Sequence, residues 1–486
     1  MNFPLGDEGE ICYNEINRFQ NTMTIDLRHI EATLRDKVLV LATRIQRAGG
    51  RAWLVGGSVR DMLLGRAVTD VDFEVHGLAP DKLEAVIGEA DDYDACGLSF
   101  GVLKIAHWPI DIALPRRESK RGLGHKGFLI NSDPFLSIDE TAQRRDFTIN
   151  ALYFDPLSGE LADPCGGLAD LEAGVLRHVS AHFVEDPLRV LRGMQFIARF
   201  DLKPAPETVA LCQTMTPEGL ASERQFEEWS KLLVGGKRIS AGLDFLRATG
   251  WVKYYPELAA LSGCLQNPEW HFEGDVWAHT CLCLDSFARD RIGDATEDLI
   301  VGLAVLCHDF GKPLVSKKDP VTGRIRSLGH DVAGLAPTRA FLRRLTNEER
   351  ILKEVPRLVE THMQPFSLWQ GKSCPAAIRR LAVRVGRIDR LIRVCQADSN
   401  GSICSPTNAC QHEKGIELKW LAAEAEKLRV ADAAPKPILM GRHLIELGYK
   451  PSSQFKKLLN TCFEAQLDGA FTDLDGAIAY FKENCQ

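Results

Sequence analysis

The sequence lacks the features that define several classes of protein. Its longest uninterrupted hydrophobic run, Leu299–Cys307, is far shorter than the ~20 residues that a helix needs to cross a bilayer. The opening residues are acidic and show no basic segment followed by a hydrophobic one, so we expect no secretion signal. None of the 14 cysteines forms a Cys-x-x-Cys pair. We therefore expect free thiols in a reducing cytoplasm.

Neither sign of charge dominates the composition. Lys and Arg number 59 against 66 Asp and Glu, which gives a net charge of −7. This balance argues against a simple nucleic-acid coat but allows a nucleic-acid enzyme, because local patches matter more than the sum. A hydrophobic fraction of 45% with 40 Gly and 23 Pro excludes disordered and collagen-like chains. The length suggests about three domains at ~100–200 residues each.

The spacing of hydrophobic residues changes along the chain. A mixed α/β pattern comes first, and from about Asp170 onward nearly every segment has a helical pattern. We expect strands at Arg51–Val55, Val68–Val75, Phe100–His107 and Ile110–Leu114, and helices at Leu27–Gln46 and Ser58–Leu64. The fold class is therefore an α/β head with a mixed sheet, followed by all-α regions. We divide the chain into a loose leader (1–28), the head (29–165), a helical neck and body (166–260), a helical domain (261–405) and a helical tail (406–486).

The first candidate site begins where a strand meets two glycines. Gly56 and Gly57 separate the first strand from a helix, so backbone N–H groups at that turn can hold a phosphate, and Arg60 follows in the first turns. Asp70 and Asp72 come next, two residues apart on a predicted strand, so both side chains point to one face. Carboxylates this close repel each other unless a cation lies between them.

Hard oxygen ligands of this kind suit Mg²⁺. Asp111, on a neighbouring predicted strand, is a candidate third carboxylate. An ordinary acidic turn is the alternative interpretation of the pair, and the glycine turn beside it favours the metal site.

Together these segments resemble the head of the bacterial and eukaryotic type of CCA-adding enzyme, a family shared with bacterial poly(A) polymerase. Further family motifs follow in order between about Trp53 and Ala260: Arg144-Arg145-Asp146, Glu185-Asp186-Pro187-Leu188-Arg189, and Glu223-Arg224 with Glu228. The resemblance implies transfer of nucleotides from CTP and ATP to the 3′ end of tRNA, with release of pyrophosphate.

The resemblance also implies roles for individual residues. Arg145 and Asp146 would contact the nucleotide and favour ribose, and Glu185, Asp186 and Arg189 would select it. Arg60, Arg145 and Arg192 would neutralise the triphosphate. Gln195 stands where the family commonly has a further Arg, which changes the expected phosphate contacts but not the reaction class.

Asp186 and Arg189 suggest how a protein chooses a base. At i and i+3 on a helix the two side chains are neighbours. A carboxylate accepts hydrogen bonds and a guanidinium donates them. Cytosine and adenine both present an amine donor beside a ring-nitrogen acceptor, so one pair suits both bases, whereas guanine and uracil present the reverse pattern. A surface ion pair is the structural alternative.

The family also contains poly(A), A-only and CC-only enzymes. The segment 116–143, basic and glycine-bearing at its start, lies where CCA enzymes have the flexible loop that switches C to A addition. We therefore favour CCA addition, with poly(A) polymerase or A-only addition as the alternative.

A second candidate site lies in the helical half. His279, the pair His308-Asp309 and Asp398 follow the order of the HD phosphohydrolase superfamily, in which four such side chains bind one metal. Nitrogen and carboxylate ligands suit Mn²⁺, Fe²⁺ or Ni²⁺. The resemblance implies phosphodiesterase, phosphatase or 2′,3′-cyclic phosphodiesterase activity, and it places His330 and His362 where extra histidines bind a second metal or phosphate. A vestigial bundle that only holds tRNA is the alternative.

Arg380, Arg384 and Arg387 fall at i, i+4 and i+7, which predicts one basic helical face for RNA backbone. We expect no membrane or DNA partner. Two rival interpretations are an HD phosphohydrolase with a degenerate head and a non-catalytic RNA-binding protein. Intact motifs at both sites argue against them.

Overall fold

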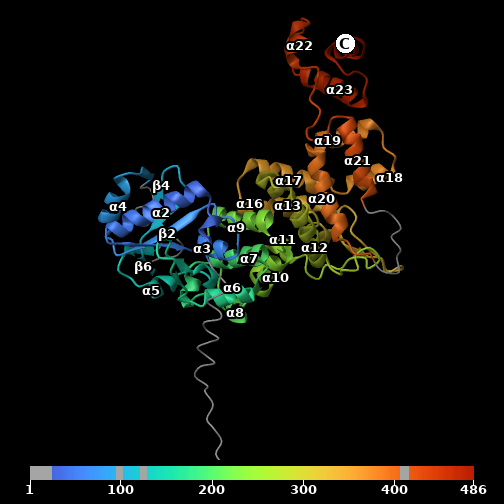
Figure 1. Cartoon of the computed structure of the whole chain (residues 1–486). Coiled ribbons are helices and arrows are strands. Elements are labelled where there is room, and N and C mark those ends of the chain that lie inside the picture. The colour runs from blue at the N-terminus through green and yellow to red at the C-terminus, as the bar shows by residue number, and fades with distance from the viewer. Residues whose placement is uncertain (1–24, 95–101, 121–127, 405–414, 486) are drawn as a thin grey trace, which may run out of the picture. The chain divides into compact units, whose positions relative to one another are not determined.

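The computed structural model describes residues 25–94, 102–120, 128–404 and 415–485 (Figure 1). The chain forms two compact units. The first comprises Met1–Gly193 with Leu202–Leu220, and the second comprises Met194–Asp201 with Ala221–Gln486. The five-part division expected from the sequence stays a prediction.

The first unit is built on a mixed seven-stranded sheet in the order β3-β4-β5-β2-β1-β8-β9, so the expected fold class is confirmed. β1 and β2 are antiparallel, whereas β2 and β5 are parallel. The strands are β1 (Arg51–Val55), β2 (Val71–His76), β3 (Tyr93–Asp94), β4 (Val102–Ile105), β5 (Ile110–Ala113), β8 (Tyr153–Phe154) and β9 (Leu161–Ala162).

Two helices cover this sheet, α2 (Ala32–Arg47) and α4 (Pro80–Gly88) (Figure 1). α2 buries one hydrophobic stripe at helical spacing, which consists of Leu34, Val38, Leu41 and Ile45. This stripe shares a core with the inward-facing side chains Val71, Phe73 and Val75 of β2. Alternation along β2 therefore leaves Asp72 on the other face.

Where a mobile loop was expected, the described residues form regular structure. β6 (Arg116–Lys120) and β7 (Phe128–Ser132) pair antiparallel, and residues 121–127 lie outside the described residues. A short helix, α5 (Ile138–Ala142), follows and begins with a capping box between Ser137 and Glu140. Interstrand hydrogen bonds explain the pairing, because they satisfy the backbone without requiring a hydrophobic pattern in the sequence.

The second unit is helical. Its central helix, α13 (Ala295–Cys307), is buried on all sides from Ile300 to Cys307 and contacts α9 (Ser222–Gly235), α12 (Val276–Arg289), α17 (Glu349–Thr361) and α20 (Ile388–Gly401). Uniform hydrophobicity is typical of a central helix. α12 and α20 approach closely at Gly401, where a Cβ would overlap Cys283.

Further helices complete the two units. They are α3 (Gly57–Leu63), α6 (Gly167–Ala173), α7 (Leu188–Phe200), α8 (Pro206–Gln213), α10 (Ile239–Ala248), α11 (Pro256–Ala259), α14 (Lys312–Val315), α15 (His330–Ala333), α16 (Leu335–Leu345), α18 (Gln364–Gln370), α19 (Pro375–Val385) and α21 (Ile416–Lys427). The tail helices α22 (Gly441–Glu446), α23 (Phe455–Asp468) and α24 (Leu474–Asn484) enclose a hydrophobic cluster of their own.

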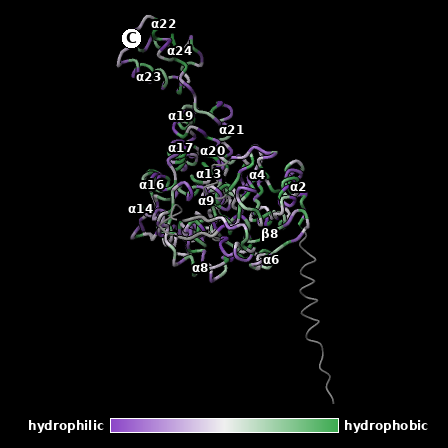
Figure 2. Tube along the Cα trace, turned by 90° about the vertical axis from the view of Figure 1, so that its left-hand side faces the viewer, coloured by the Kyte–Doolittle hydropathy of each residue, from purple (hydrophilic) through white to green (hydrophobic). Residues whose placement is uncertain are grey.

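Hydrophilic and hydrophobic residues alternate along much of the chain (Figure 2), as expected of amphipathic helices. Within the described ranges, no helix is both long and hydrophobic enough to cross a membrane.

The single basic face expected from Arg380, Arg384 and Arg387 is wrong. α19 ends at Val385 because Gly386 takes a φ of +87°, and Arg387 precedes α20 in an extended conformation. Arg380 donates to Glu464 and Asp468 of α23 at 3.0 and 2.8 Å. Acidic side chains therefore offset part of this positive charge, and contact with RNA stays a prediction.

Candidate active sites

The first site forms at the edge where β2 and β5 run parallel. Asp72 and Asp111 are register partners on these two strands. The strand begins at Val71, so Asp70 lies just before β2 and not within it as expected. Asp70 and Asp111 both act electrostatically on Asp72, and the three predicted carboxylates therefore lie together.

This cluster favours a bound cation. Partial loss of hydration, and then the negative charge of Asp70, raise the pKa of Asp72 to about 6, and Asp111 adds to the effect. Lys104 Nζ lies 2.9 Å from Asp111 Oδ2. Three carboxylates suit a hard divalent ion such as Mg²⁺, whose charge would offset the repulsion among them. The residues present therefore fit the predicted metal.

The glycine turn and Arg145 lie directly beside the carboxylates. Gly56 has a φ of +70°, which favours glycine, and a Cβ there would lie 3.5 Å from Arg145 Nη1 and 3.8 Å from Asp72 Oδ2. Glu74 Oε2 accepts from Arg145 Nη2 at 2.9 Å, and the Tyr153 hydroxyl accepts from Arg145 Nε at 3.2 Å. These two hydrogen bonds hold Nε and Nη2 of the guanidinium, while Nη1 faces the glycine turn.

Glu74 is a functional candidate that the motif analysis missed, although its position follows from the strand period. It lies two residues beyond Asp72 and so shares its face of β2. Burial alone would raise the pKa of Glu74, but hydrogen bonding to His76 and the charge of Arg145 lower it to about 2.

Arg60 has partners within the protein. It is buried, Nη1 donates to Asn150 Oδ1 at 2.6 Å, and Nη2 forms an ion pair with Asp61. A Cβ at Gly57 would lie 3.4 Å from Arg60 Nη2. The guanidinium therefore folds back beneath the glycine turn, and its direct contact with phosphate stays a prediction.

Asp146 organises the next pair of predicted nucleotide contacts. It accepts from Arg192 Nε at 2.7 Å and from Asn150 Nδ2 at 3.0 Å. Burial alone would raise the pKa of Asp146, but the charge of Arg192 lowers it. Asp146, Asn150 and Arg60 thus form one buried network that joins two predicted motifs.

Asp186 lies outside the helix that was expected to carry it. It is extended, with φ −122° and ψ 105°, because the residue before a proline is disfavoured in helical conformation. Its Oδ1 accepts from the N–H of Leu188 at 3.1 Å, at the start of α7. Arg189 donates to the carbonyls of His182 and Arg144 at 2.8 and 2.6 Å.

Two other residues of this motif region have observed partners. Glu185 lies 3.5 Å from Arg144. Gln195, where the family commonly has Arg, is buried and accepts from Arg199 Nη1 at 3.1 Å.

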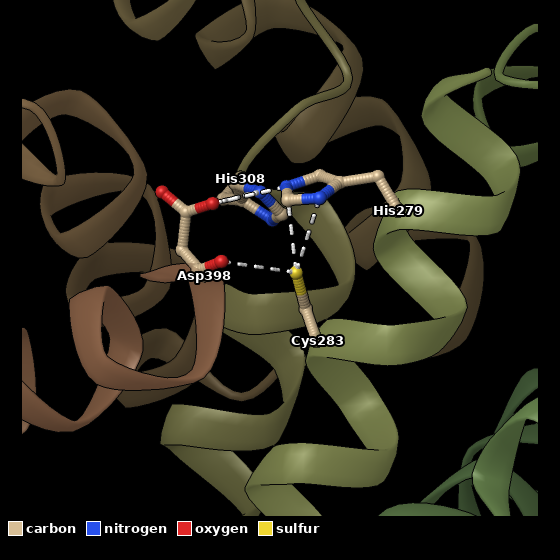
Figure 3. A group of neighbouring side chains, drawn as sticks. All are labelled: His279, Cys283, His308 and Asp398. Carbon is tan, nitrogen blue, oxygen red and sulfur yellow. Dashed lines mark hydrogen bonds and ion pairs between the residues drawn. The ribbon is translucent and has the colours of Figure 1, made fainter. Parts of the chain in front are cut away.

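The second site joins three helices of the second unit. His279 comes from α12, His308 and Asp309 from the end of α13, and Asp398 from α20. His279 Nε2 lies 2.9 Å from Asp398 Oδ1 (Figure 3). His308 Nε2 lies 3.3 Å from Asp309 Oδ2. The four side chains predicted from 120 residues of sequence therefore meet at one point.

His330 and His362 extend this cluster. In His308, His330 and His362, Nδ1 lies 2.6–2.8 Å from a backbone carbonyl oxygen. When Nδ1–H donates a hydrogen bond to this carbonyl, Nε2 carries no proton and its lone pair is available to a metal. The Nε2 atoms of His330 and His362 lie only 3.0 Å apart, where two lone pairs repel unless a proton or cation lies between them.

Unsatisfied atoms support the fit of a metal. Within the described residues, His308 Nε2 and Asp309 Oδ1 are buried and make no well-oriented hydrogen bond, because their nearest charged neighbours lie 3.3–3.4 Å away. Such atoms are costly unless a ligand binds them. Although burial alone would lower the pKa of His279, Cys283 and Asp398 raise it well above its usual range. Imidazole and carboxylate donors suit the transition metals predicted for this site.

Cys283 and Glu273 belong to this site but were not predicted. Cys283 Sγ lies 3.4 Å from His279 Nε2 (Figure 3), one helical turn along α12. The i, i+4 spacing was the available signal. Glu273 Oε1 lies 3.0 Å from His279 Nδ1, on the side of the ring opposite the metal ligands. No helical spacing links Glu273 to His279, because it precedes α12.

The segment that carries Asp309 and the segment that carries His330 touch at Gly311. A Cβ at this residue would overlap the carbonyl oxygen of His330. The turn that carries Asp309 therefore packs directly on the start of α15, and this contact brings His330 Nε2 to 3.4 Å from Asp309 Oδ1.

A pocket of about 560 Å³ opens at the second site. Its lining includes the metal-site residues Asp309, His330, His362 and Asp398. Such a volume accommodates a small organic ligand.

Comparison with known proteins agrees with this architecture. The family described as "Poly A polymerase head domain" matches residues 52–177, the region that carries the glycine turn and the three carboxylates. This region is therefore a nucleotidyltransferase-type head.

Relatives extend the match to most of the chain. The "Multifunctional CCA protein" of Xanthomonas campestris pv. campestris (strain B100) is 36% identical over 400 residues, covering 79% of this chain and 93% of the relative. That of Xylella fastidiosa (strain M23) is 38% identical, covering 72% and 84%. The chain therefore belongs to the multifunctional CCA protein family.

Solved structures share the fold at lower identity. The "Bacillus stearothermophilus CCA-adding enzyme in complex with CTP" matches with a TM-score of 0.63 and 20% identity, covering 93% of this chain and 98% of that one. The "Thermotoga maritima CCA-adding enzyme complexed with tRNA_CCA" gives 0.57 and 17%, covering 97% and 98%.

Proposed function

We propose that this protein adds the 3′-terminal CCA to tRNA from CTP and ATP without a nucleic-acid template. The observation that carries the proposal is the meeting of Asp72, Asp111, Gly56 and Arg145 at one edge of the sheet. Membership of the multifunctional CCA protein family supports it.

The arrangement supports nucleotidyl transfer. Asp70, Asp72 and Asp111 would hold divalent ions, with Mg²⁺ the best fit, and such ions would supply positive charge at the tRNA 3′-hydroxyl and at the departing pyrophosphate. Arg145 Nη1 and the backbone at Gly56 orient the triphosphate beside these carboxylates. Glu74 holds Arg145 in place throughout.

Base selection rests on Asp186 and Arg189. The Asp186 carboxylate would accept a hydrogen bond from the base amine, and the Arg189 guanidinium would donate one to the ring nitrogen. Cytosine and adenine both present this donor and acceptor. Extension of the tRNA end then needs no template strand. Free cysteines throughout the described residues support action in a reducing cytoplasm.

An incorporation assay tests the proposal. The protein is incubated with tRNA lacking its 3′ end, Mg²⁺ and single labelled nucleotides. We expect C to be added from CTP alone and A to follow when ATP joins. Long A tails without CTP would instead identify a poly(A) polymerase, and A added only to tRNA ending in CC would identify an A-only enzyme.

We further propose that the second site is a metal-dependent phosphohydrolase, acting as a 2′,3′-cyclic phosphodiesterase or phosphatase. Two observations favour this proposal. His279, His308, Asp309 and Asp398 meet at one place, and some of their buried polar atoms make no well-oriented hydrogen bond. Ni²⁺ and Mn²⁺ are the metals to test. Hydrolysis of a 2′,3′-cyclic nucleotide with either metal should disappear in Asp398→Ala, and survival of the activity would defeat the assignment.

A further inference from the structure

One wall of the second-site pocket holds an amide donor without a partner. Gln266 lines the pocket and is 7% exposed. Its Oε1 accepts from Lys312 Nζ at 2.7 Å. Because Lys can only donate, this contact fixes the amide orientation and places Nε2 on the other side. Within the described part of the chain Nε2 is buried and has no hydrogen-bond partner.

Lys312 ties this amide to the metal site. Its Nζ also lies 2.7 Å from Asp309 Oδ2, so Gln266, Lys312 and Asp309 form one chain of contacts. A buried donor without an acceptor is costly, and a phosphate oxygen is an acceptor of the kind that a phosphohydrolase brings to its metal. Arg326, exposed on β13 (Ile325–Arg326), also lines the pocket and adds positive charge.

The same pocket contains an aromatic side chain in contact with solvent. Trp270 lines it and is 51% exposed. The lining also contains the hydrophobic side chains Ile325, Leu328 and Met363. Beside them the flat indole offers a stacking surface that the π-face of any nucleobase can use. The pocket volume of about 560 Å³ accommodates a base, a ribose and a phosphate together.

We infer that this pocket recognises a nucleoside phosphate ester at both ends: Trp270 stacks on the base, and Gln266 Nε2 donates to a non-bridging phosphate oxygen. The inference rests on the proposed phosphohydrolase function and deepens it. Recognition of the base explains how a hydrolase distinguishes nucleotides from other phosphate esters. Trp270 determines specificity, and Gln266 positions the phosphate.

Kinetics of the nickel-loaded full chain test the base contact. Two substrates are compared, adenosine 2′,3′-cyclic phosphate and the base-free 1-O-methylribose 2′,3′-cyclic phosphate. We expect Trp270→Ala to raise KM for the nucleotide by about tenfold or more, with kcat and the base-free substrate unchanged. Trp270→Phe should retain most affinity. Phe272→Ala is the matched control, because Phe272 is 60% exposed but does not line the pocket. An equal change for both substrates, or none, would overturn the base contact.

Gln266→Glu tests the phosphate contact. The carboxylate can still accept from Lys312, so the local fold is retained, but it repels phosphate. We expect KM to rise for both substrates while bound nickel, measured by elemental analysis, stays constant. Unchanged KM for both substrates would overturn this part of the inference.

Equilibrium binding separates the inference from the hydrolase proposal. Calorimetry measures adenosine 2′-monophosphate binding to the nickel-loaded chain in an Arg189→Ala background, which weakens the head's proposed nucleotide site. We expect binding that Trp270→Ala removes. Binding without any hydrolysis would defeat the phosphohydrolase proposal and leave the recognition site standing. Absence of binding would overturn the inference, whether or not hydrolysis occurs.

Discussion

Asp72 of β2 and Asp111 of β5 are register partners in a parallel strand pair. Neighbouring strands lie ~4.8 Å apart, so the two carboxylates face one shared position for a cation. Asp111→Asn should therefore lower CMP and AMP incorporation by about 10²–10³, the range found when one charge-stabilising group is removed. Single-turnover incorporation on truncated tRNA measures the loss.

Two controls define that result. Lys104→Ala, which removes the partner of Asp111 at 2.9 Å, should retain most activity. Asp70→Ala should abolish incorporation, whereas His308→Ala should spare it. Equal loss in the Asp70 and His308 variants would mean that the two sites are not separable.

Base selection should weaken when either Asp186, just before α7, or Arg189, within α7, is changed. Arg189→Ala removes a donor that the cytosine and adenine edges require, so discrimination against UTP should fall by about tenfold or more, as expected for a buried polar mismatch of ~1–3 kcal/mol. Competition between labelled CTP and UTP measures the ratio. A uniform loss of rate with the ratio preserved would show that Arg189 only supports the fold.

Glu74 makes the head's stability depend on pH. Its pKa is about 2 in the folded protein against an ordinary 4.5, so folding favours the ionised form. The stabilisation is complete above pH 4.5 and is lost as the pH falls toward 2. It amounts to about 3 kcal/mol by linkage.

Urea unfolding of the wild type and Glu74→Gln checks this linkage. The variant should be less stable at pH 7, and the difference between the two proteins should shrink as the pH is lowered toward 2. A difference that does not vary with pH would contradict the role given to the Glu74 charge.

Metal binding should stabilise the second unit. At a free metal concentration one hundred times Kd, the expected gain is about 3 kcal/mol. Thermal unfolding with Ni²⁺ or Mn²⁺, before and after chelation, measures the gain. Asp398→Ala should abolish it.

Cys283 provides the control for that experiment. Burial raises the pKa of its thiol, so the metal-binding thiolate is disfavoured at neutral pH. Cys283→Ala should therefore retain the metal-dependent shift. Loss of the shift in this variant would make Cys283 a ligand.

In the head, the sequence predicted best those elements whose structure depends on a single local pattern, such as the alternation of a strand. β1 matches its expected range, and the strand period places Asp72 on the face opposite the core. The expected helix for Asp186 failed because Pro187 restricts the preceding backbone. The shared basic face failed because Gly386 ends α19 two residues after Arg384. Pro187 and Gly386 are both visible in the sequence, but the prediction gave more weight to the helical spacing of the residues around them.

Contacts between distant segments were harder to predict. The order of His279, His308, Asp309 and Asp398 predicted that they meet, but no periodicity links Gln266 to Lys312. Such contacts depend on how α12, α13 and the turns beside them pack. The pairing of β6 with β7 was also missed, because their backbone hydrogen bonds do not require a hydrophobic pattern.

Gly311 adds a consequence for the second site as a whole. A single hydrogen in place of a methyl group sets the spacing between the turn of Asp309 and the helix of His330. Any side chain at this position would push the two segments apart and separate His330 from Asp309, although Gly311 itself is not a predicted ligand. Gly311→Ala should therefore disturb the second site while every one of its predicted ligands stays in the sequence.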